Sequence, residues 1–222
     1  MTKPLYKPEE FLINLFAEIL LGVDHVAVGA LSPIPGCAAL LMQELAEKKG
    51  NNNIQVSIIH GDANNPFTDG GRELFDCAGQ GRIGAFFLGG AEIDGEANIN
   101  LLGVGDYPNL DKRFPGSFGS AYIYFVVPKI ILFAPEHSKR VLVEKVKFIS
   151  APGTSPPEVY RQGGPKVLVT SMCVMSFDSS SKRFTLVSTH PGVSVEDILK
   201  NTEFDFEIAK NITITIEPDA DR

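Results

Sequence analysis

Short apolar runs alternate with helical patterns along the chain as far as Ala134. The runs "DHVAVGA", "IQVSII", "GAFFLGG" and "KIILFA" are rich in residues that favour β-strands. Between them lie "CAALLMQELAEKKG", which follows a predicted turn "LSPIPG" and ends in lysines and a glycine as helices do, and the shorter "ELFDCA". An amphipathic helix over Phe11–Leu20, opened by Pro8, comes before the first strand. Strands that alternate with helices are typical of parallel βαβ units. The pattern therefore predicts an α/β fold: an open, mostly parallel sheet with helices on both faces.

The pattern changes after Val141. "KVKFIS", "KVLVTSMCVMSF", "RFTLVST" and "NITITIEP" are predicted as strands of a more antiparallel C-terminal portion. "SVEDILKNT" between them is a short helix, with Ser194 as its N-cap and Asp197 three residues later. The loop-like segment Ala151–Pro165 is expected to be a surface excursion and not a domain boundary. One domain over residues 1–222 is predicted.

The charge of the chain argues against nucleic acid as a partner. Its 20 basic and 27 acidic residues give a net charge of −7, whereas phosphate backbones are bound by basic surfaces. The cysteines Cys37, Cys77 and Cys173 are far apart and odd in number. They therefore indicate neither zinc spacing nor a disulfide framework, and no metal site is predicted.

No membrane association is expected either. Glu9 and Glu10 precede the first apolar run, unlike the basic start of a signal peptide. No stretch of about eighteen apolar residues is present, which is what a membrane-spanning helix needs. We expect a soluble, cytoplasmic protein.

Two glycine-rich segments are candidates for a binding loop. "GGAEIDGEANINLLGVGD" follows a predicted strand but matches neither a dinucleotide-binding fingerprint nor a phosphate-binding P-loop. "RFPGSFGS" (Arg113–Ser120) has the composition of a tight turn whose backbone N–H groups can face an oxyanion or a phosphate. The alternative is that these glycines serve only to make turns, and the pattern leaves both open.

The four histidines form no obvious catalytic group, and no G-x-S-x-G nucleophile motif is present. His25 stands at a strand entrance, His190 in a Pro-Gly turn, and His137 in what reads as a solvated turn. His60 is the histidine predicted at the carboxyl tip of a core strand, where α/β enzymes place their chemistry. His60 is therefore the first candidate for the site.

Four segments together resemble a known family. "GGAEIDGEANIN", "GVGDYPNLDKRFPGSFGS", "KVKFISAPG" and "THPGVSVEDILKNTEFDF" occur in this order. They resemble the β subunit of family I CoA-transferases, most closely the glutaconate CoA-transferase type. The resemblance runs from about Ile13 to the C-terminus. It implies a CoA-transferase fold and an obligate homologous α subunit, in a heterodimer or heterotetramer.

The resemblance also implies where an acyl-CoA substrate binds. Family β subunits keep a glycine-rich turn near the CoA thioester. Coenzyme A arrives as part of the substrate, with no permanently bound cofactor. The predicted substrate-binding residues are Gly61, Gly89, Gly90, Gly116, Ser117, Phe118 and Gly119.

The nucleophile of these transferases is missing from the matching position. In the family, a glutamate at a strand tip attacks the acyl-CoA carbonyl and then carries CoA as a glutamyl thioester. Alignment on Gly61 places Ile59 or His60 at this position. Neither supplies the carboxylate that the route requires. Asp62 is the nearest acidic residue, so His60 and Asp62 are the candidate catalytic residues.

One branch of the superfamily also lacks this glutamate. Its members open the last ring in steroid degradation by hydrolysis, with the working carboxylate supplied by the α subunit. "GDA" at Gly61–Ala63 and "HPG" at His190–Gly192 resemble that branch. The favoured prediction is therefore a β-type subunit for hydrolysis or C–C cleavage of an acyl-CoA. A true CoA-transferase that uses Asp62 and a non-catalytic structural subunit stay open.

Overall fold

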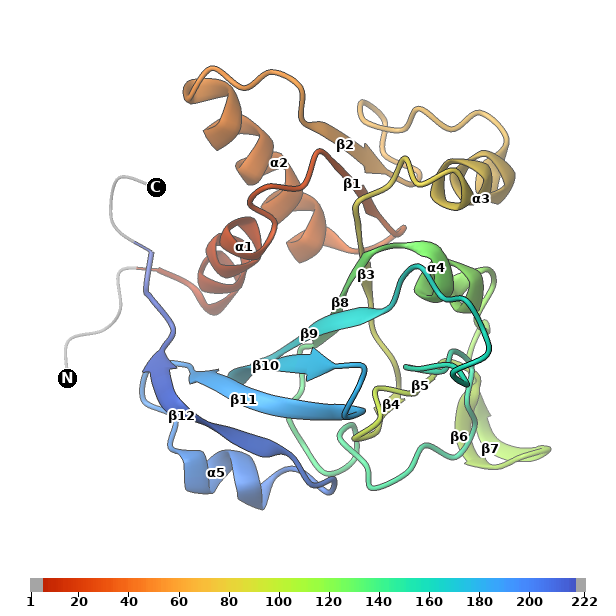
Figure 1. Cartoon of the computed structure of the whole chain (residues 1–222), viewed down its shortest axis with the longest axis vertical. Coiled ribbons are helices and arrows are strands. Elements are labelled where there is room, and N and C mark those ends of the chain that lie inside the picture. Colours follow the sequence, from red (N-terminus) through yellow and green to blue (C-terminus); the bar gives the residue numbers. More distant parts are fainter. Residues whose placement is uncertain (1–5, 219–222) are drawn as a thin grey trace. The chain divides into compact units, whose positions relative to one another are not determined.

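The computed structural model describes residues 6–218 and divides the chain into two compact units. The first unit contains the described residues up to Phe87 together with those from Thr215 onward, and the second spans Leu88–Ile214. In Figure 1 the N-terminal part of the first unit is coloured red to yellow and its C-terminal residues are blue, while the second unit runs from yellow-green to blue. The sequence predicts a single domain over residues 1–222, and the division into two units does not test this prediction.

The first unit contains three parallel strands in the order β3-β1-β2. These are β1 (His25–Val28), β2 (Gln55–Ile58) and β3 (Ala85–Leu88), each within a segment that the sequence predicts as a strand. β1 pairs with both neighbours, and all four of its residues are buried. A strand buried on both faces is expected to be uniformly apolar, as "HVAV" nearly is.

The helices of this unit cover both faces of its strands. α2 (Pro33–Lys48) connects β1 to β2, and α3 (Gly70–Gly79) connects β2 back across β1 to β3. Because both crossovers are right-handed and run in opposite directions, the two helices lie on opposite faces (Figure 1). α1 (Pro8–Ile19) packs against α2. The predicted α/β class with helices on both faces is confirmed here.

One expected turn in this unit is wrong. The segment "LSPIPG" was predicted as a loop before the second helix, but α2 already begins at Pro33 and includes Pro35. Proline is tolerated in the first turn of a helix because the N–H groups there have no partner within the helix. The prolines therefore lie in the first turn of this helix and do not shift its start to a later residue.

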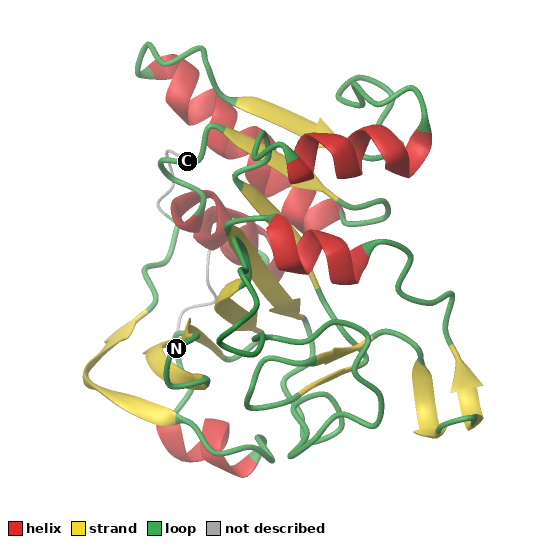
Figure 2. Cartoon of the chain, turned by 45° about the vertical axis from the view of Figure 1, so that its right-hand side comes forward, coloured by secondary structure: helices red, strands yellow, loops and turns green. Residues whose placement is uncertain are grey.

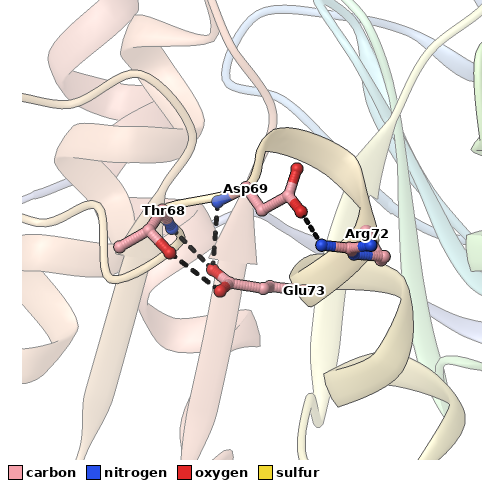
Figure 3. A network of polar contacts seen from close by, with 4 residues as sticks. All are labelled: Thr68, Asp69, Arg72 and Glu73. Carbon is pink, nitrogen blue, oxygen red and sulfur yellow. Dashed lines mark hydrogen bonds and ion pairs between the residues drawn. The ribbon is translucent and has the colours of Figure 1, made fainter.

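The start of α3 is fixed by a network of polar side chains (Figure 3). The carboxylate of Glu73 accepts hydrogen bonds from the Thr68 hydroxyl and from the backbone N–H groups of Thr68 and Asp69. Arg72 forms an ion pair with Asp69 one turn earlier. The Thr68 hydroxyl, followed by its backbone N–H, lowers the pKa of Glu73. The loop after β2 is thus anchored at its far end.

The second unit carries the antiparallel portion of the fold. β8 (Lys129–Ala134) pairs in parallel with β9 (Pro165–Thr170), while β9, β10 (Cys173–Asp178) and β11 (Arg183–Thr189) run antiparallel. β12 (Glu207–Ile214) pairs in parallel with β11 after the short helix α5 (Val195–Lys200). The predicted antiparallel C-terminal portion is confirmed.

The segment "KVLVTSMCVMSF", predicted as a strand, forms two. The Thr170 hydroxyl oxygen accepts hydrogen bonds from the backbone N–H groups of Met172 and Cys173, both at 3.1 Å. These bonds close a tight turn between β9 and β10. A side chain therefore supplies the turn where neither glycine nor proline is present.

Five smaller elements of the second unit were not predicted. They are β4 (Glu92–Ile93), β5 (Ile99–Asn100), β6 (Gly103–Asp106), β7 (Asn109–Arg113) and α4 (Ser120–Val126). β4 and β5 form one hairpin and β6 and β7 another; the latter extends outward in Figure 2. The four strands are short and carry little apolar periodicity, so they give no strand signal.

The predicted strand "KVKFIS" is absent from the second unit. Two backbone N–H groups in this segment pair with carboxylates: Val146 donates to Asp94 at 3.4 Å and Lys147 to Glu92 at 2.9 Å. At its last residue, the N–H of Ser150 donates to the backbone carbonyl of Ile99 in β5 at 2.9 Å. The alternation of apolar and basic residues resembles a strand, but the partners in the middle of the segment are side chains. The tertiary partners therefore override the local preference.

Within residues 6–218, no helix combines the length and the apolar character needed to span a lipid bilayer.

His137 is buried, which corrects its prediction as a residue of a solvated turn. Only 7% of it is exposed, and it joins three segments of the second unit. The Thr202 hydroxyl donates to the carbonyl of Ile198, so its oxygen accepts from Nε2–H of His137 at 3.0 Å. Nδ1 then accepts from the Thr170 hydroxyl at 2.8 Å. Burial lowers the pKa of His137 to about 4 and keeps the ring neutral.

The free energy of unfolding is expected to fall as the pH drops below about 6.5, the pKa of an unfolded histidine. Because the folded-state pKa of His137 is depressed, the unfolded chain binds the extra proton between pH 6.5 and about 4. The loss reaches at most about 1.4 kcal/mol per pH unit for one histidine. Urea titrations from pH 7.5 to 5 measure it.

The variant His137→Asn should be less stable at pH 7 but lose stability less steeply on acidification. Its remaining slope comes partly from His25 and His190, whose pKa values burial also lowers. Between pH 7 and 8 the two proteins should change in parallel. Equal slopes below pH 6.5 would show that His137 is not the group that titrates.

Candidate active site

The tip of β2 presents His60 to solvent in a constrained turn. Ile59 extends the pairing with β1, since its N–H donates to the carbonyl of Val28 at 3.0 Å. His60 is exposed and has a φ of +62°, in the left-handed region that non-glycine residues rarely adopt. The N–H of Gly61 donates to the carbonyl of Ile58 at 2.9 Å and closes the turn. His60 is thus placed at a carboxyl strand edge, as predicted. The expectation of a core strand is wrong, because β2 is the outermost strand in the sheet order and pairs with β1.

Gly61 is required by the packing of this turn. A Cβ atom at Gly61 would lie 3.1 Å from the carbonyl oxygen and 3.2 Å from Cβ of Ile58. Contacts this short force the neighbours to move. The role of Gly61 in this structure is to let the chain fold back tightly beneath His60, and its binding of substrate stays a prediction.

An apolar groove of about 820 Å³ lies beside this tip, entirely within the first unit. It is formed by the loop after β1, the first turns of α2 and the tip of β2. A cavity of this size is in the range that small-molecule sites occupy. Its lining residues are Ala30, Leu31, Ser32, Pro33, Gly36, Cys37, Leu40, Ile58, Ile59, His60 and Gly61.

Asp62 lies outside this groove. It is exposed, on the loop that leads from the β2 tip to the network at the start of α3. Of the two predicted catalytic residues, only His60 lines the groove. A catalytic role for either stays a prediction.

The segment Gly116–Gly119 forms a turn directly before α4 in the second unit. Gly116 has a φ of +99° and Phe118 of +41°, whereas Gly119 has a φ of −97°, which any residue adopts. The backbone N–H of Ser120 donates to the carbonyl of Ser117 at 2.7 Å and closes the turn. Gly116 and Phe118 therefore have the left-handed conformation in this turn and Gly119 does not, and Phe118 is 87% exposed.

Gly89 and Gly90 are packed closely against other backbone atoms. A Cβ at Gly89 would lie 2.9 Å from the carbonyl oxygen of Phe133, and one at Gly90 would lie 2.7 Å from that of Glu92. Neither position has room for a side chain. Both glycines therefore have a packing role in the second unit, beside the substrate-binding role that was predicted for them.

The conspicuous acidic motif "EIDGEANIN" is a buried structural network. Glu92 accepts hydrogen bonds from the Asn100 side chain at 2.8 Å and from the N–H of Lys147 at 2.9 Å. Asp94 accepts from the N–H and the side chain of Asn98, and Asn98 in turn accepts from the N–H of Gly153 at 3.0 Å. Buried carboxylates are tolerated when hydrogen bonds satisfy them. Sequence reasoning noted this motif but missed its structural role.

Two other histidines are also structural. His25 donates from Nδ1 to the carbonyl of Arg82 at 2.8 Å, and its Nε2 then accepts from the fully buried Ser57 hydroxyl at 2.8 Å. This Ser–His pair has no exposed oxygen to attack a substrate. His190 donates from Nε2 to the carbonyl of Thr170 at 2.9 Å. Burial lowers the pKa of both rings.

In the part of the chain that the structure describes, no group of three or more His, Cys, Asp or Glu side chains is arranged to hold a metal ion.

The comparison with protein families decides the membership of the chain. The coenzyme A transferase family matches residues 23–201, which include every element from β1 to α5. The chain belongs to the coenzyme A transferase family. This confirms the predicted family, and the match contains both the β2 tip and the Gly116–Gly119 turn.

Two relatives represent different enzymes of this kind. The B-type subunit of glutaconate CoA-transferase from Acidaminococcus fermentans is 35% identical over 135 residues, which cover 58% of this chain and 50% of that subunit. The IpdB subunit of the cholesterol ring-cleaving hydrolase from Rhodococcus jostii is 26% identical over 95% of this chain and 72% of its own length. The chain thus spans only about half the length of the first relative.

The solved structures share the fold. The crystal structure of Rhodococcus jostii IpdAB superimposes with a TM-score of 0.81 at 22% identity, covering 98% of this chain and 92% of that one. The decarboxylase AibA/AibB gives a TM-score of 0.78 at 24% identity, covering 96% and 90%. At these identities the likeness concerns the fold alone, and it confirms the predicted CoA-transferase architecture.

Replacing His60 with glycine is expected to raise the free energy of unfolding by up to about 1 kcal/mol, because glycine adopts a positive φ without strain. Lys182→Gly is the matched control, since Lys182 has a φ of +56° in the turn between β10 and β11 and is not among the residues that line the groove. Chemical denaturation measures both. If His60→Gly destabilises the chain while Lys182→Gly stabilises it, the His60 side chain has stabilising contacts beyond its backbone.

Proposed function

We propose that this chain is the β-type subunit of a heteromeric enzyme that acts on an acyl-CoA. Its partner is a homologous α-type subunit, in a heterodimer or heterotetramer. The reaction is hydrolysis or cleavage of a C–C bond, with the key carboxylate supplied by the α-type subunit. Coenzyme A enters as part of the substrate, and no cofactor is permanently bound. The cytoplasmic location stays a prediction.

The observation that carries this proposal is the side chain at the tip of β2. A covalent CoA-transferase needs a carboxylate that attacks the thioester carbonyl and then carries CoA. The groove beside the tip is lined by Ile59 and His60, and by no Asp or Glu among the described residues. A subunit without this carboxylate supports binding and orientation of the substrate but not the formation of an acyl-enzyme anhydride.

The relatives support the same reading. IpdB, named as part of a ring-cleaving hydrolase, aligns with 95% of this chain, whereas the glutaconate CoA-transferase subunit aligns with 58%. AibA/AibB, a decarboxylase, has the same fold. Reactions other than CoA transfer are therefore compatible with this fold, and loss of the nucleophile directs the proposal toward them.

A true CoA-transferase is the second candidate, because Asp62 lies only two residues beyond His60 and is exposed. Its loop runs from the β2 tip to the anchored start of α3, so its carboxylate would have to be carried toward the thioester by a loop movement. A non-catalytic structural subunit is the remaining alternative from the sequence. The experiments below separate these three.

We expect no covalent CoA adduct on this subunit. The complex with its α-type partner would be incubated with acyl-CoA and divided in two. One half is analysed directly by intact mass for a CoA adduct, and the other is treated with borohydride, which reduces an enzyme-bound thioester to an alcohol and releases CoA, before its activity and mass are measured. The mass of this chain and the activity should be unchanged, and Asp62→Asn should lower turnover by less than about threefold because no covalent step depends on it. A CoA adduct that disappears in the Asp62→Asn variant would establish the transferase instead.

Gly116→Ala is expected to lower turnover at least about tenfold, because a misplaced oxyanion donor costs this much or more. Gly22→Ala is the control: both glycines have positive φ, +99° and +81°, and a Cβ at either meets no atom within 4 Å. Each should cost about 1 kcal/mol of stability through backbone strain. If the two variants have equal activity, the Gly116 turn has no role in the reaction. If both variants keep the full activity of the unchanged complex, the alternative of a non-catalytic structural subunit is favoured.

A further inference from the structure

We propose that the groove in the first unit holds the acyl part of the CoA thioester, and that this acyl group is an uncharged, mainly hydrocarbon one. The inference rests on the proposed function and adds the substrate class to it. An acyl group that ends in hydrocarbon fits, whereas one that ends in a free carboxylate does not. Four features of the groove lead to this assignment.

The first feature is the composition of the walls. Leu31 comes from the loop after β1, Leu40 from α2, and Ile58 and Ile59 from the tip of β2. Three separate segments thus direct aliphatic carbon into one space of about 820 Å³. Apolar surface of this kind gains free energy when it covers hydrocarbon, and it gains nothing from a polar ligand.

The second feature is the charge of the walls. Among the described residues, no carboxylate, ammonium or guanidinium group lines the groove; its polar side chains are those of Ser32, Cys37 and His60. A ligand carboxylate placed there would lose water and gain no cation to balance it, which is strongly unfavourable. The acyl groups of dicarboxylates such as glutaconate carry such a carboxylate, so this groove discriminates against them.

The third feature is the backbone at the rim. Leu31 and His60 are two of the described non-glycine residues with positive φ, at +58° and +62°, and both line this groove. A left-handed conformation costs a non-glycine residue about 1 kcal/mol or more, and such residues cluster at ligand-binding sites. Leu31 is also 100% exposed, so nothing from the described chain covers its apolar side chain at the rim of the groove.

The fourth feature is the position of the groove. It opens at the carboxyl edge of β1 and β2, where open α/β sheets bind their ligands. His60 is at the end of the apolar walls. This arrangement suits a substrate that places an apolar chain between the hydrocarbon walls and its polar, reacting group beside the imidazole of His60.

Cys37 makes the occupancy of this groove measurable without any turnover. It lines the groove and is exposed, whereas Cys173 is buried and Cys77 lies on α3, outside the groove lining. In the complex of a Cys77→Ser chain with its α-type partner, the rate at which iodoacetamide alkylates Cys37 of this chain reports whether the groove is filled. Intact mass gives this rate, and calorimetry on the same samples gives the affinity for each thioester.

The probes are butyryl-CoA, octanoyl-CoA and suberyl-CoA, the last with the chain length of octanoyl-CoA and a terminal carboxylate. We expect octanoyl-CoA to protect Cys37 at a concentration at least tenfold lower than butyryl-CoA, since each buried methylene adds up to about fourfold in affinity. Suberyl-CoA should require at least tenfold more than octanoyl-CoA. Leu40→Gln should weaken protection by octanoyl-CoA about fivefold or more, and Leu199→Gln, an exposed leucine on α5, should not change it.

The outcomes separate this inference from the proposed function. Equal protection by octanoyl-CoA and suberyl-CoA, or thioester binding that leaves Cys37 unprotected, overturns the acyl assignment and leaves a CoA-thioester enzyme in place. Protection by sodium octanoate with no affinity for any thioester supports an apolar ligand in the groove and overturns the proposed function. No protection by any of these probes overturns the assignment of the groove.

Discussion

Two buried carboxylates hold the second unit together. Glu92 and Asp94 are 7% and 4% exposed, and their oxygens accept hydrogen bonds from Asn100 and Asn98 and from backbone N–H groups of a distant segment. Removing these donors would leave an uncompensated buried charge, which costs several kcal/mol. The irregular segment after Val141 therefore has its path fixed by the hairpin of β4 and β5. The same hairpin holds α4, since the Tyr124 hydroxyl donates to the carbonyl of Ala97 at 2.6 Å. The Gly116–Gly119 turn precedes α4, so its position depends on this network as well.

The regular elements could be predicted where local preference and burial agree. "HVAV" and "KIILFA" are apolar, favour strands and are buried as β1 and β8, so pattern and structure coincide. "KVKFIS" has a similar pattern, but the donors in it are used by Glu92 and Asp94, and no local rule reports this. α4 was missed for the opposite reason, because the aromatic and β-branched residues of "SAYIYFV" favour a strand and not a helix. Tertiary contacts decide both segments.

The candidate site, too, could be predicted from the sequence only in part. His60 could be placed from the sequence, because its position depends only on where β2 ends. The groove could not, since Leu31 and Leu40 come from a loop and a helix and become neighbours only through the crossover that α2 makes. His137 was misplaced because its neighbours Glu136, Lys139 and Arg140 are charged, which indicates solvent. Those side chains form surface ion pairs, while the imidazole between them turns inward to Thr170 and Thr202.

The apolar groove and the missing carboxylate are physically consistent with each other. A glutamate at the position of His60 would stand at the end of walls that carry no cation, so loss of water would raise its pKa and favour the protonated form. A protonated carboxyl group is a poor nucleophile. A transferase is therefore helped by cationic groups around its carboxylate, and no lysine or arginine is among the described residues that line this groove. A site that had lost only its nucleophile would be expected to keep such groups. Their absence argues that the surroundings of the β2 tip suit an apolar substrate and a carboxylate from elsewhere, and that the difference from a transferase extends beyond a single residue.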